Sequence, residues 1–64
     1  MFALFSTVND ELMIINVEKV LYVCTTKRTG VFRVYLGEDG LYFDIKSSSE
    51  DIERIFLTSN NSKN

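Results

Sequence analysis

Apolar and polar side chains alternate along much of residues 1–46, in short runs that turn-forming residues separate. A period of two is typical of β-strands that bury one face, and these runs are rich in the β-branched and aromatic residues that strands favour. The pattern predicts a mainly β chain with five short antiparallel strands. Their expected bounds are Phe2–Thr7, Leu12–Asn16, Lys19–Thr25, Val31–Gly37 and Leu41–Lys46.

The loops between the last three expected strands indicate how these strands pair. If “KRTG” is a four-residue loop, Val23 lies opposite Val34, and a similar loop at “GEDG” places Val34 opposite Phe43. Gly40 suits such a hairpin because glycine accepts a positive φ without a Cβ clash. A register shifted by two residues keeps the same faces and changes only the partners.

One face of these three strands is continuously apolar: Leu21, Val23, Phe32, Val34, Leu36, Leu41, Phe43 and Ile45. The other face carries Tyr22, Cys24, Arg33, Tyr35, Tyr42, Asp44 and Lys46.

The pattern changes after Lys46. In “SSSEDIERIF”, residues 47–56, serine is twice followed three residues later by an acid, which is the spacing of a helix capping box. An apolar stripe with helical spacing follows, made of Ile52, Ile55 and Phe56. These features predict a short amphipathic helix that packs on the sheet. Residues 1–57 are therefore expected to form one domain, and the polar residues 58–64 a disordered tail.

A core built from 64 residues is small, because a domain of about this size buries only roughly 60% of the surface of its unfolded chain. The usual supports are a disulfide, a metal or a partner chain. Cys24 is the only cysteine, and the chain has no histidine and no cluster of zinc ligands. We therefore expect a homodimer that shares its core, with neither a metal nor another cofactor.

The longest apolar runs, “MFALF” and “VLYVC”, are much shorter than the ~20 residues that a membrane helix needs. No charged segment precedes an apolar stretch as in a secretory signal. We expect a cytoplasmic protein with a reduced thiol and no membrane partner. Catalysis is not expected, since a small chain without histidine, P-loop or nucleophile elbow has little with which to build acid–base chemistry.

The net charge of −2 is unevenly distributed. Residues 18–37 carry four cations against one carboxylate, a net +3, whereas residues 38–64 carry six carboxylates against three cations, a net −3. Nucleic-acid binding draws much of its strength from cations that neutralise phosphates, so an acidic chain is poorly suited to non-specific binding. Any nucleic-acid site must therefore be local.

Three segments carry a resemblance to a known family: “VNDELMI”, “VFRVYL” and “FDIKSSSEDIERI”. They resemble V-G-E-T-L-M-I, Q-V-R-I-G-V and V-A-V-H-R-E-E-I-Y-Q-R-I of the carbon storage regulator (CsrA/RsmA) family, which also places its strands before one helix. Arg33 falls on the family's arginine, and two extra residues stand before the helix. The resemblance spans residues 1 to about 56.

The resemblance implies an intertwined homodimer in which the first strand of one chain pairs with the last strand of the other. It also implies control of translation through binding to GGA-containing hairpin loops of mRNA, or to a small regulatory RNA. Backbone groups along the joined edges of these two strands would read the bases. The implied RNA-binding residues are Leu4, Ser6, Thr7, Arg33, Ile45, Lys46 and Ser47.

This chain departs from the family pattern at positions that carry charge. Ser6 and Thr7 stand where the family has two arginines, and Ser47 where it has another. Acidic Glu38-Asp39 replaces the A-P of the family's last loop. Fewer phosphate contacts predict weaker RNA binding with a shallower salt dependence. The alternative, from a different class, is a protein-interaction module on the same fold that has lost RNA binding and acts by dimerisation or by docking a protein on its tyrosine face.

Several side chains on the polar face leave two interpretations open. Arg33 either contacts RNA or pairs with Asp44 across the hairpin. Lys27 and Arg28 either steer phosphates or are simply solvated. The tyrosines either stack on unpaired bases or pack within the dimer: Tyr22, Tyr35 and Tyr42.

Other side chains are expected in the core. Leu12, Ile14 and Phe43 are placed on central strands and predicted to be buried, with “LMII” in a sheet that the partner chain completes. Cys24 is expected to be a small buried hydrophobe, with no neighbouring group that would activate its thiol.

Overall fold

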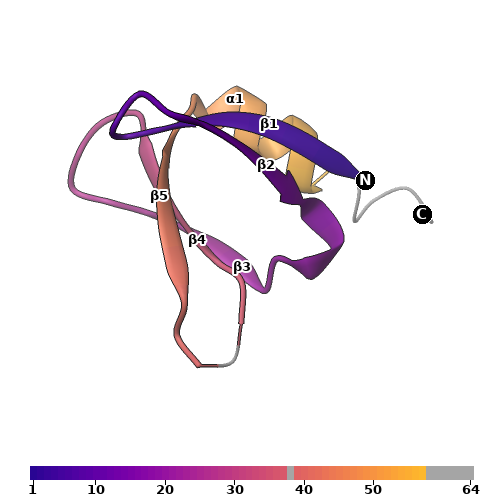
Figure 1. The fold of residues 1–64 in the computed structure, drawn as a ribbon. Coiled ribbons are helices and arrows are strands. Elements are labelled where there is room, and N and C mark those ends of the chain that lie inside the picture. The colour runs from indigo at the N-terminus through magenta and orange to yellow at the C-terminus, as the bar shows by residue number, and fades with distance from the viewer. Residues whose placement is uncertain (38, 58–64) are drawn as a thin grey trace.

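A computed structural model of the chain describes residues 1–37 and 39–57, so the tail predicted at 58–64 lies outside the described residues. The chain is mainly β, with five antiparallel strands in one sheet and a C-terminal helix (Figure 1). The elements are β1 (Phe2–Thr7), β2 (Leu12–Asn16), the 3-10 turn η1 (Val17–Lys19), β3 (Tyr22–Thr25), β4 (Val31–Tyr35), β5 (Tyr42–Lys46), α1 (Ser49–Ile52) and the π-helical turn η2 (Glu53–Leu57).

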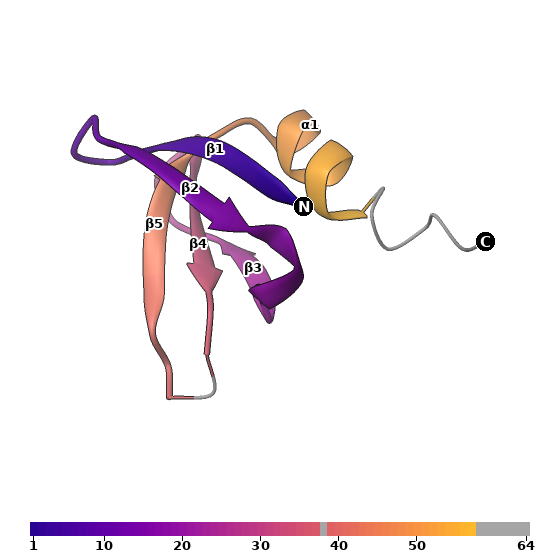
Figure 2. The same ribbon diagram turned by 45° about the vertical axis from the view of Figure 1, so that its right-hand side comes forward.

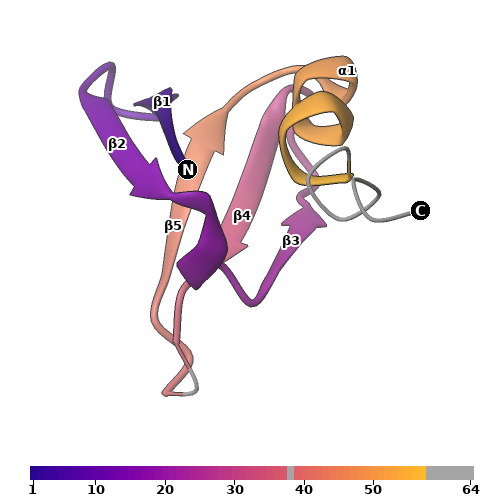
Figure 3. The same ribbon diagram turned by 90° about the vertical axis from the view of Figure 1, so that its right-hand side faces the viewer.

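The strands lie in the order β2-β1-β5-β4-β3, which makes β2 and β3 the edge strands. β1 pairs with β2 along its length, but it joins β5 through only two residue pairs, Ser6 with Lys46 and Thr7 with Ile45. Figure 3 shows the β1–β2 hairpin on one side and the three strands β3, β4 and β5 on the other. The first strand thus pairs with the last strand of the same chain, and an exchange of this pairing between two chains stays a prediction.

The register of β3, β4 and β5 is the unshifted one that the two loops predict. Val23 lies opposite Val34, and Val34 lies opposite Phe43. Gly40 has a φ of 83°, the left-handed conformation expected of the glycine in this turn. Because the side chains of paired residues share a face, the polar faces of these three strands also come together.

The core lies between the two halves of the sheet and the helix. Val34 and Ile45 are fully buried. The ring of Phe56 in η2 stacks on Phe5 of β1, with 6.1 Å between the ring centroids. The helical segment therefore lies beside β1 and closes the open side of the sheet (Figure 2). The core cluster is Phe5, Ile15, Phe32, Val34 and Ile45.

The helix begins where the capping spacing predicts. Ser48 is the N-cap, and its Oγ accepts a hydrogen bond from the backbone N–H of Asp51 at 3.1 Å. The α-helical part is a single turn, after which η2 continues the stripe that packs on the core, made of Ile52, Ile55 and Phe56. No helix within residues 1–37 and 39–57 is long and apolar enough to cross a membrane.

The strand bounds differ from the prediction at the third strand. Lys19, predicted as the first residue of the third strand, is instead the last residue of the turn η1. Asn16 Oδ1 caps this turn by accepting a hydrogen bond from Glu18 N at 3.2 Å. β3 therefore begins at Tyr22 and not at Lys19. The β4–β5 hairpin is also regular over a shorter length than predicted, ending at Tyr35 and resuming at Tyr42.

Three predictions of burial are wrong for the single chain. Cys24 is exposed, because it lies on the outward face of an edge strand. Leu12 and Ile14 are exposed as well, because β2 is an edge strand whose inward face is formed by Met13 and Ile15. Phe43, the third residue assigned to the core with them, is half-buried.

Candidate functional site

The predicted RNA-binding edge lies at the junction of β1 and β5, but two of its residues face inward. Ile45 is fully buried in the core, and Thr7 is buried beside it. Thr7 Oγ1 accepts hydrogen bonds from the backbone N–H groups of Asn9 and Glu11, both at 3.2 Å. The Thr7 side chain therefore holds the β1–β2 turn, and neither of these two side chains is available to a ligand.

The polar residues of this junction are engaged within the chain. Lys46 forms an ion pair with Asp10 of the β1–β2 turn, and this hydrogen bond lowers the pKa of the Asp10 carboxyl below its ordinary value. Ser47 is half-buried, and its backbone N–H donates to the carbonyl of Gly30 at 2.9 Å. Ser6 is half-buried as well. Among the described residues at the junction, only Lys46 carries a positive charge, and a carboxylate neutralises it.

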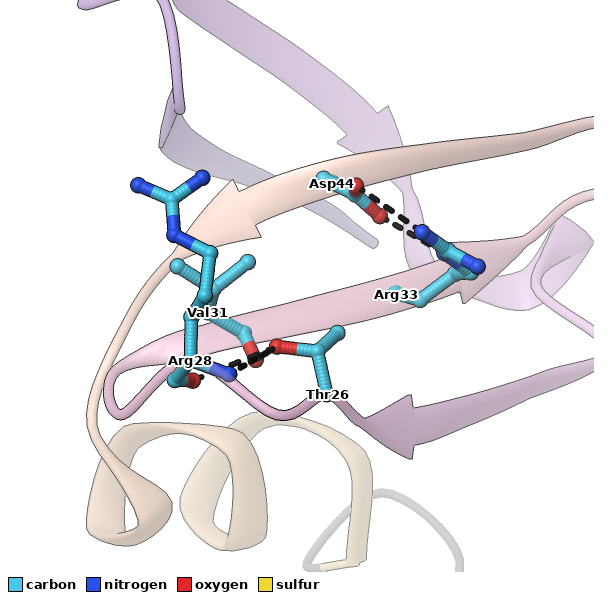
Figure 4. A network of polar contacts seen from close by, with 5 residues as sticks. All are labelled: Thr26, Arg28, Val31, Arg33 and Asp44. Atoms are coloured by element: carbon cyan, nitrogen blue, oxygen red, sulfur yellow. Dashed lines mark hydrogen bonds and ion pairs between the residues drawn. The ribbon is translucent and has the colours of Figure 1, made fainter.

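Arg33 is close to this junction, on the outward face of β4. It forms two hydrogen bonds with Asp44, from Nε to Oδ1 at 2.9 Å and from Nη2 to Oδ2 at 3.2 Å (Figure 4). These bonds raise the pKa of the Arg33 guanidinium and lower the pKa of the Asp44 carboxyl. The guanidinium also lies 4.2 Å from the centroid of the Tyr42 ring, a cation–π distance. The ion pair that the register predicts is confirmed.

The three tyrosines form a continuous row on the outward face of β3, β4 and β5. Tyr35 is the cross-strand partner of both Tyr22 and Tyr42, and the ring centroids lie 4.5 Å and 5.5 Å from it, respectively. Tyr22 and Tyr42 are about half exposed. We call these residues the tyrosine row.

A shallow groove of about 640 Å³ leads from the tyrosine row to the β3–β4 loop. Lys27 and Arg28 line its far end, and neither forms an ion pair with any residue that the structure describes. Thr26 shapes the loop, because its hydroxyl donates to the Val31 carbonyl at 2.8 Å and accepts from Arg28 N at 3.2 Å. In Figure 4, the Arg28 guanidinium extends from the loop past Val31 toward β5.

The β1–β2 hairpin exposes a second surface, which is apolar. Leu4 and Ile14 are cross-strand partners on its outward side, and Leu12 follows on the same side of β2. We call this set the outer apolar face, and its members are Phe2, Leu4, Leu12 and Ile14, exposed by 68%, 60%, 72% and 69%. Exposed apolar patches are typical of interaction surfaces. Sequence reasoning placed Leu12 and Ile14 in the core, because “LMII” is apolar at successive positions and does not indicate which side faces inward. It assigned Leu4 to the RNA-binding edge.

These features define a small antiparallel β protein with two exposed faces suited to binding, one apolar and one aromatic and basic. Within residues 1–37 and 39–57, no group of three or more His, Cys, Asp or Glu side chains is arranged to hold a metal ion. No protein-family model, no curated protein and no solved structure matches this chain.

Proposed function

We propose that the protein is a homodimeric interaction module in which the outer apolar faces of two copies pack against each other. The observation that carries this proposal is the exposure of Phe2, Leu4, Leu12 and Ile14 on one side of a single hairpin. The proposal keeps the dimerisation of the protein-interaction alternative in the sequence analysis and assigns the dimer contact to a particular surface. The small core of the chain and its resemblance to a dimeric family support the same choice.

The energetics favour a second copy over a polar partner. Full burial of such a side chain contributes about 1.5–3 kcal/mol, and since roughly two-thirds of each is exposed, one face supplies roughly 4–8 kcal/mol. Association costs about 4–15 kcal/mol in lost translational and rotational freedom. Two faces packed on each other supply roughly 8–16 kcal/mol, which is of the same size as that cost, whereas one face covers only its lower part. A two-fold dimer buries both apolar faces in a single contact, because each copy carries the same patch.

Control of translation through GGA hairpins at the β1–β5 junction has less support from the geometry. The Thr7 and Ile45 side chains are buried, and Lys46 is paired with a carboxylate. The phosphate contacts that drive such binding would have to come from other residues. The dimer is therefore the stronger proposal for this fold.

The proposal is tested by light scattering on variants that place a charge in the apolar face. Leu4→Asp and Ile14→Asp should each convert the dimer into folded monomers of 7.4 kDa, because a carboxylate would be buried without a partner. The matched control is Leu41→Asp, which makes the same change at an exposed leucine outside this face and should stay dimeric. A wild-type protein that is a folded monomer at micromolar concentration would overturn the proposal, as would a dimer that both variants leave intact.

A further inference from the structure

The tyrosine row offers an aromatic surface on the outward side of the sheet, formed by residues other than those of the outer apolar face. Neighbouring rings of the row are tilted against each other by 40° and 51°. Its rings are in contact with one another, and the cross-strand pairing of β3, β4 and β5 keeps them in place. Arg33 lies over Tyr42 and is itself held by two hydrogen bonds to Asp44. The surface is therefore preorganised, with little side-chain freedom left to lose when a planar group stacks on it.

The groove that leads from this surface to the β3–β4 loop is positively charged, although the chain as a whole is acidic. The groove beside the row contains Lys27, Arg28 and Arg33 against the single carboxylate Asp44, a net charge of +2. The whole chain has a net charge of −2. A ligand that approaches this face therefore meets a local potential of the opposite sign to that of the protein, and this favours an anion.

We propose that this face binds single-stranded nucleic acid, with bases on the half-exposed rings of Tyr22 and Tyr42 and phosphates beside Lys27 and Arg28. Unpaired bases expose the planar faces that aromatic side chains stack on, and a basic groove that follows the backbone is the usual complement. A duplex does not fit this description, because its bases are already stacked on one another. An acidic peptide would satisfy Lys27 and Arg28 but leave the aromatic row without a role.

The fluorescence of the protein itself can report whether a ligand binds to the tyrosine row. The chain contains three tyrosines and no tryptophan, and all three tyrosines belong to the row, so intrinsic fluorescence reports on this face alone. Adding an unlabelled single-stranded oligouridylate at low salt should quench that fluorescence. The same titration, followed by anisotropy of a labelled oligouridylate, gives the affinity.

Variants of the protein distinguish the contribution of base stacking to binding from the contribution of charge. Tyr22→Leu with Tyr42→Leu removes two aromatic faces and should weaken binding tenfold or more, whereas the corresponding phenylalanine variant should bind as the wild type does. Lys27→Ala with Arg28→Ala should reduce the salt slope by about 1.4, since each phosphate contact on a single strand contributes roughly 0.7. The matched control, Lys19→Ala with Arg54→Ala, removes two cations that do not line the groove and should leave the slope unchanged.

Four results would overturn the proposal. One is the absence of quenching by oligouridylate at low salt. Another is an equal loss of binding in the groove variant and in its matched control, which would show a response to net charge alone. The third is displacement by polyglutamate as effective as displacement by oligouridylate, which would assign the face to acidic peptides. A duplex should compete poorly, and stronger binding by the duplex would contradict the stacking geometry. Circular dichroism of each variant confirms that the fold is retained.

Discussion

Arg33 and Asp44 are cross-strand partners whose charged groups sit on an open face of the sheet, and their contact has a consequence for acid stability. The hydrogen bonds from Arg33 lower the pKa of the Asp44 carboxyl below its ordinary value of 3.8. The unfolded chain therefore binds this proton more readily than the folded chain does. The stabilisation is present above the ordinary pKa and is lost as the pH falls through the lower pKa of the folded state.

We therefore expect Asp44→Asn to reduce the urea midpoint at pH 6, and the difference from the wild type to shrink as the pH is lowered toward 2. The measurement is a series of urea unfolding curves between these pH values. Glu53→Gln is a suitable control because Glu53 is exposed and forms no ion pair with a described residue. A difference between the Asp44 variant and the wild type that stays constant across this range would show that the carboxylate contributes nothing through its charge.

Ile45 on β5 and Leu41 in the loop before it are both aliphatic but differ in burial. Ile45 has no exposed surface, whereas Leu41 is more than half exposed. Ile45→Ala should lower the free energy of unfolding by about 2–5 kcal/mol, because it removes buried methyl groups and leaves a cavity. Leu41→Ala should change it by less than about 0.5 kcal/mol. Denaturant titration of the two variants tests this order, and similar losses would show that Ile45 contributes no more to the core than Leu41 does.

The short C-terminal helix begins at a side-chain cap. Ser48→Ala removes the Oγ that accepts from Asp51 N, and we expect a loss of about 0.5–2 kcal/mol. Ser49→Ala, one position later and inside the helix, is the matched control and should cost less. Thermal melts of the two variants give the comparison. If the control is as destabilising as Ser48→Ala, the cap is not what stabilises this helix.

The sequence predicts the structure of β3, β4 and β5 better than that of the β1–β2 hairpin. In β3, β4 and β5 only one face is apolar, so the alternation identifies the buried side. The two loops between these strands then predict the register and the cross-strand pairs of Arg33 and Tyr35. The β1–β2 hairpin is apolar on both sides, so its sequence cannot distinguish Ile15, which is buried, from Ile14, which is exposed. The strand prediction also missed the cap at Asn16, because a single side-chain hydrogen bond leaves no periodic pattern.

Residues 1–37 and 39–57 present two surfaces with different chemistry on different parts of one sheet. The outer apolar face belongs to the β1–β2 hairpin, and the tyrosine row belongs to β3, β4 and β5. β1 and β5 meet through only two residue pairs. The two parts of the sheet that carry these surfaces are therefore joined by a narrow contact. A dimer formed through the apolar face would leave the tyrosine row of each copy free to bind its own ligand.

The most direct test of the proposed dimer is an isotope-filtered NMR experiment on a mixture of labelled and unlabelled copies. It detects contacts between methyl groups of one copy and protons of the other. The dimer proposed here predicts intermolecular contacts from the methyl groups of Leu4, Leu12 and Ile14, and none from Val34 or Ile45, which are fully buried in the core. Intermolecular contacts confined to the tyrosine row, or none from the β1–β2 hairpin in a protein that is dimeric by mass, would contradict it.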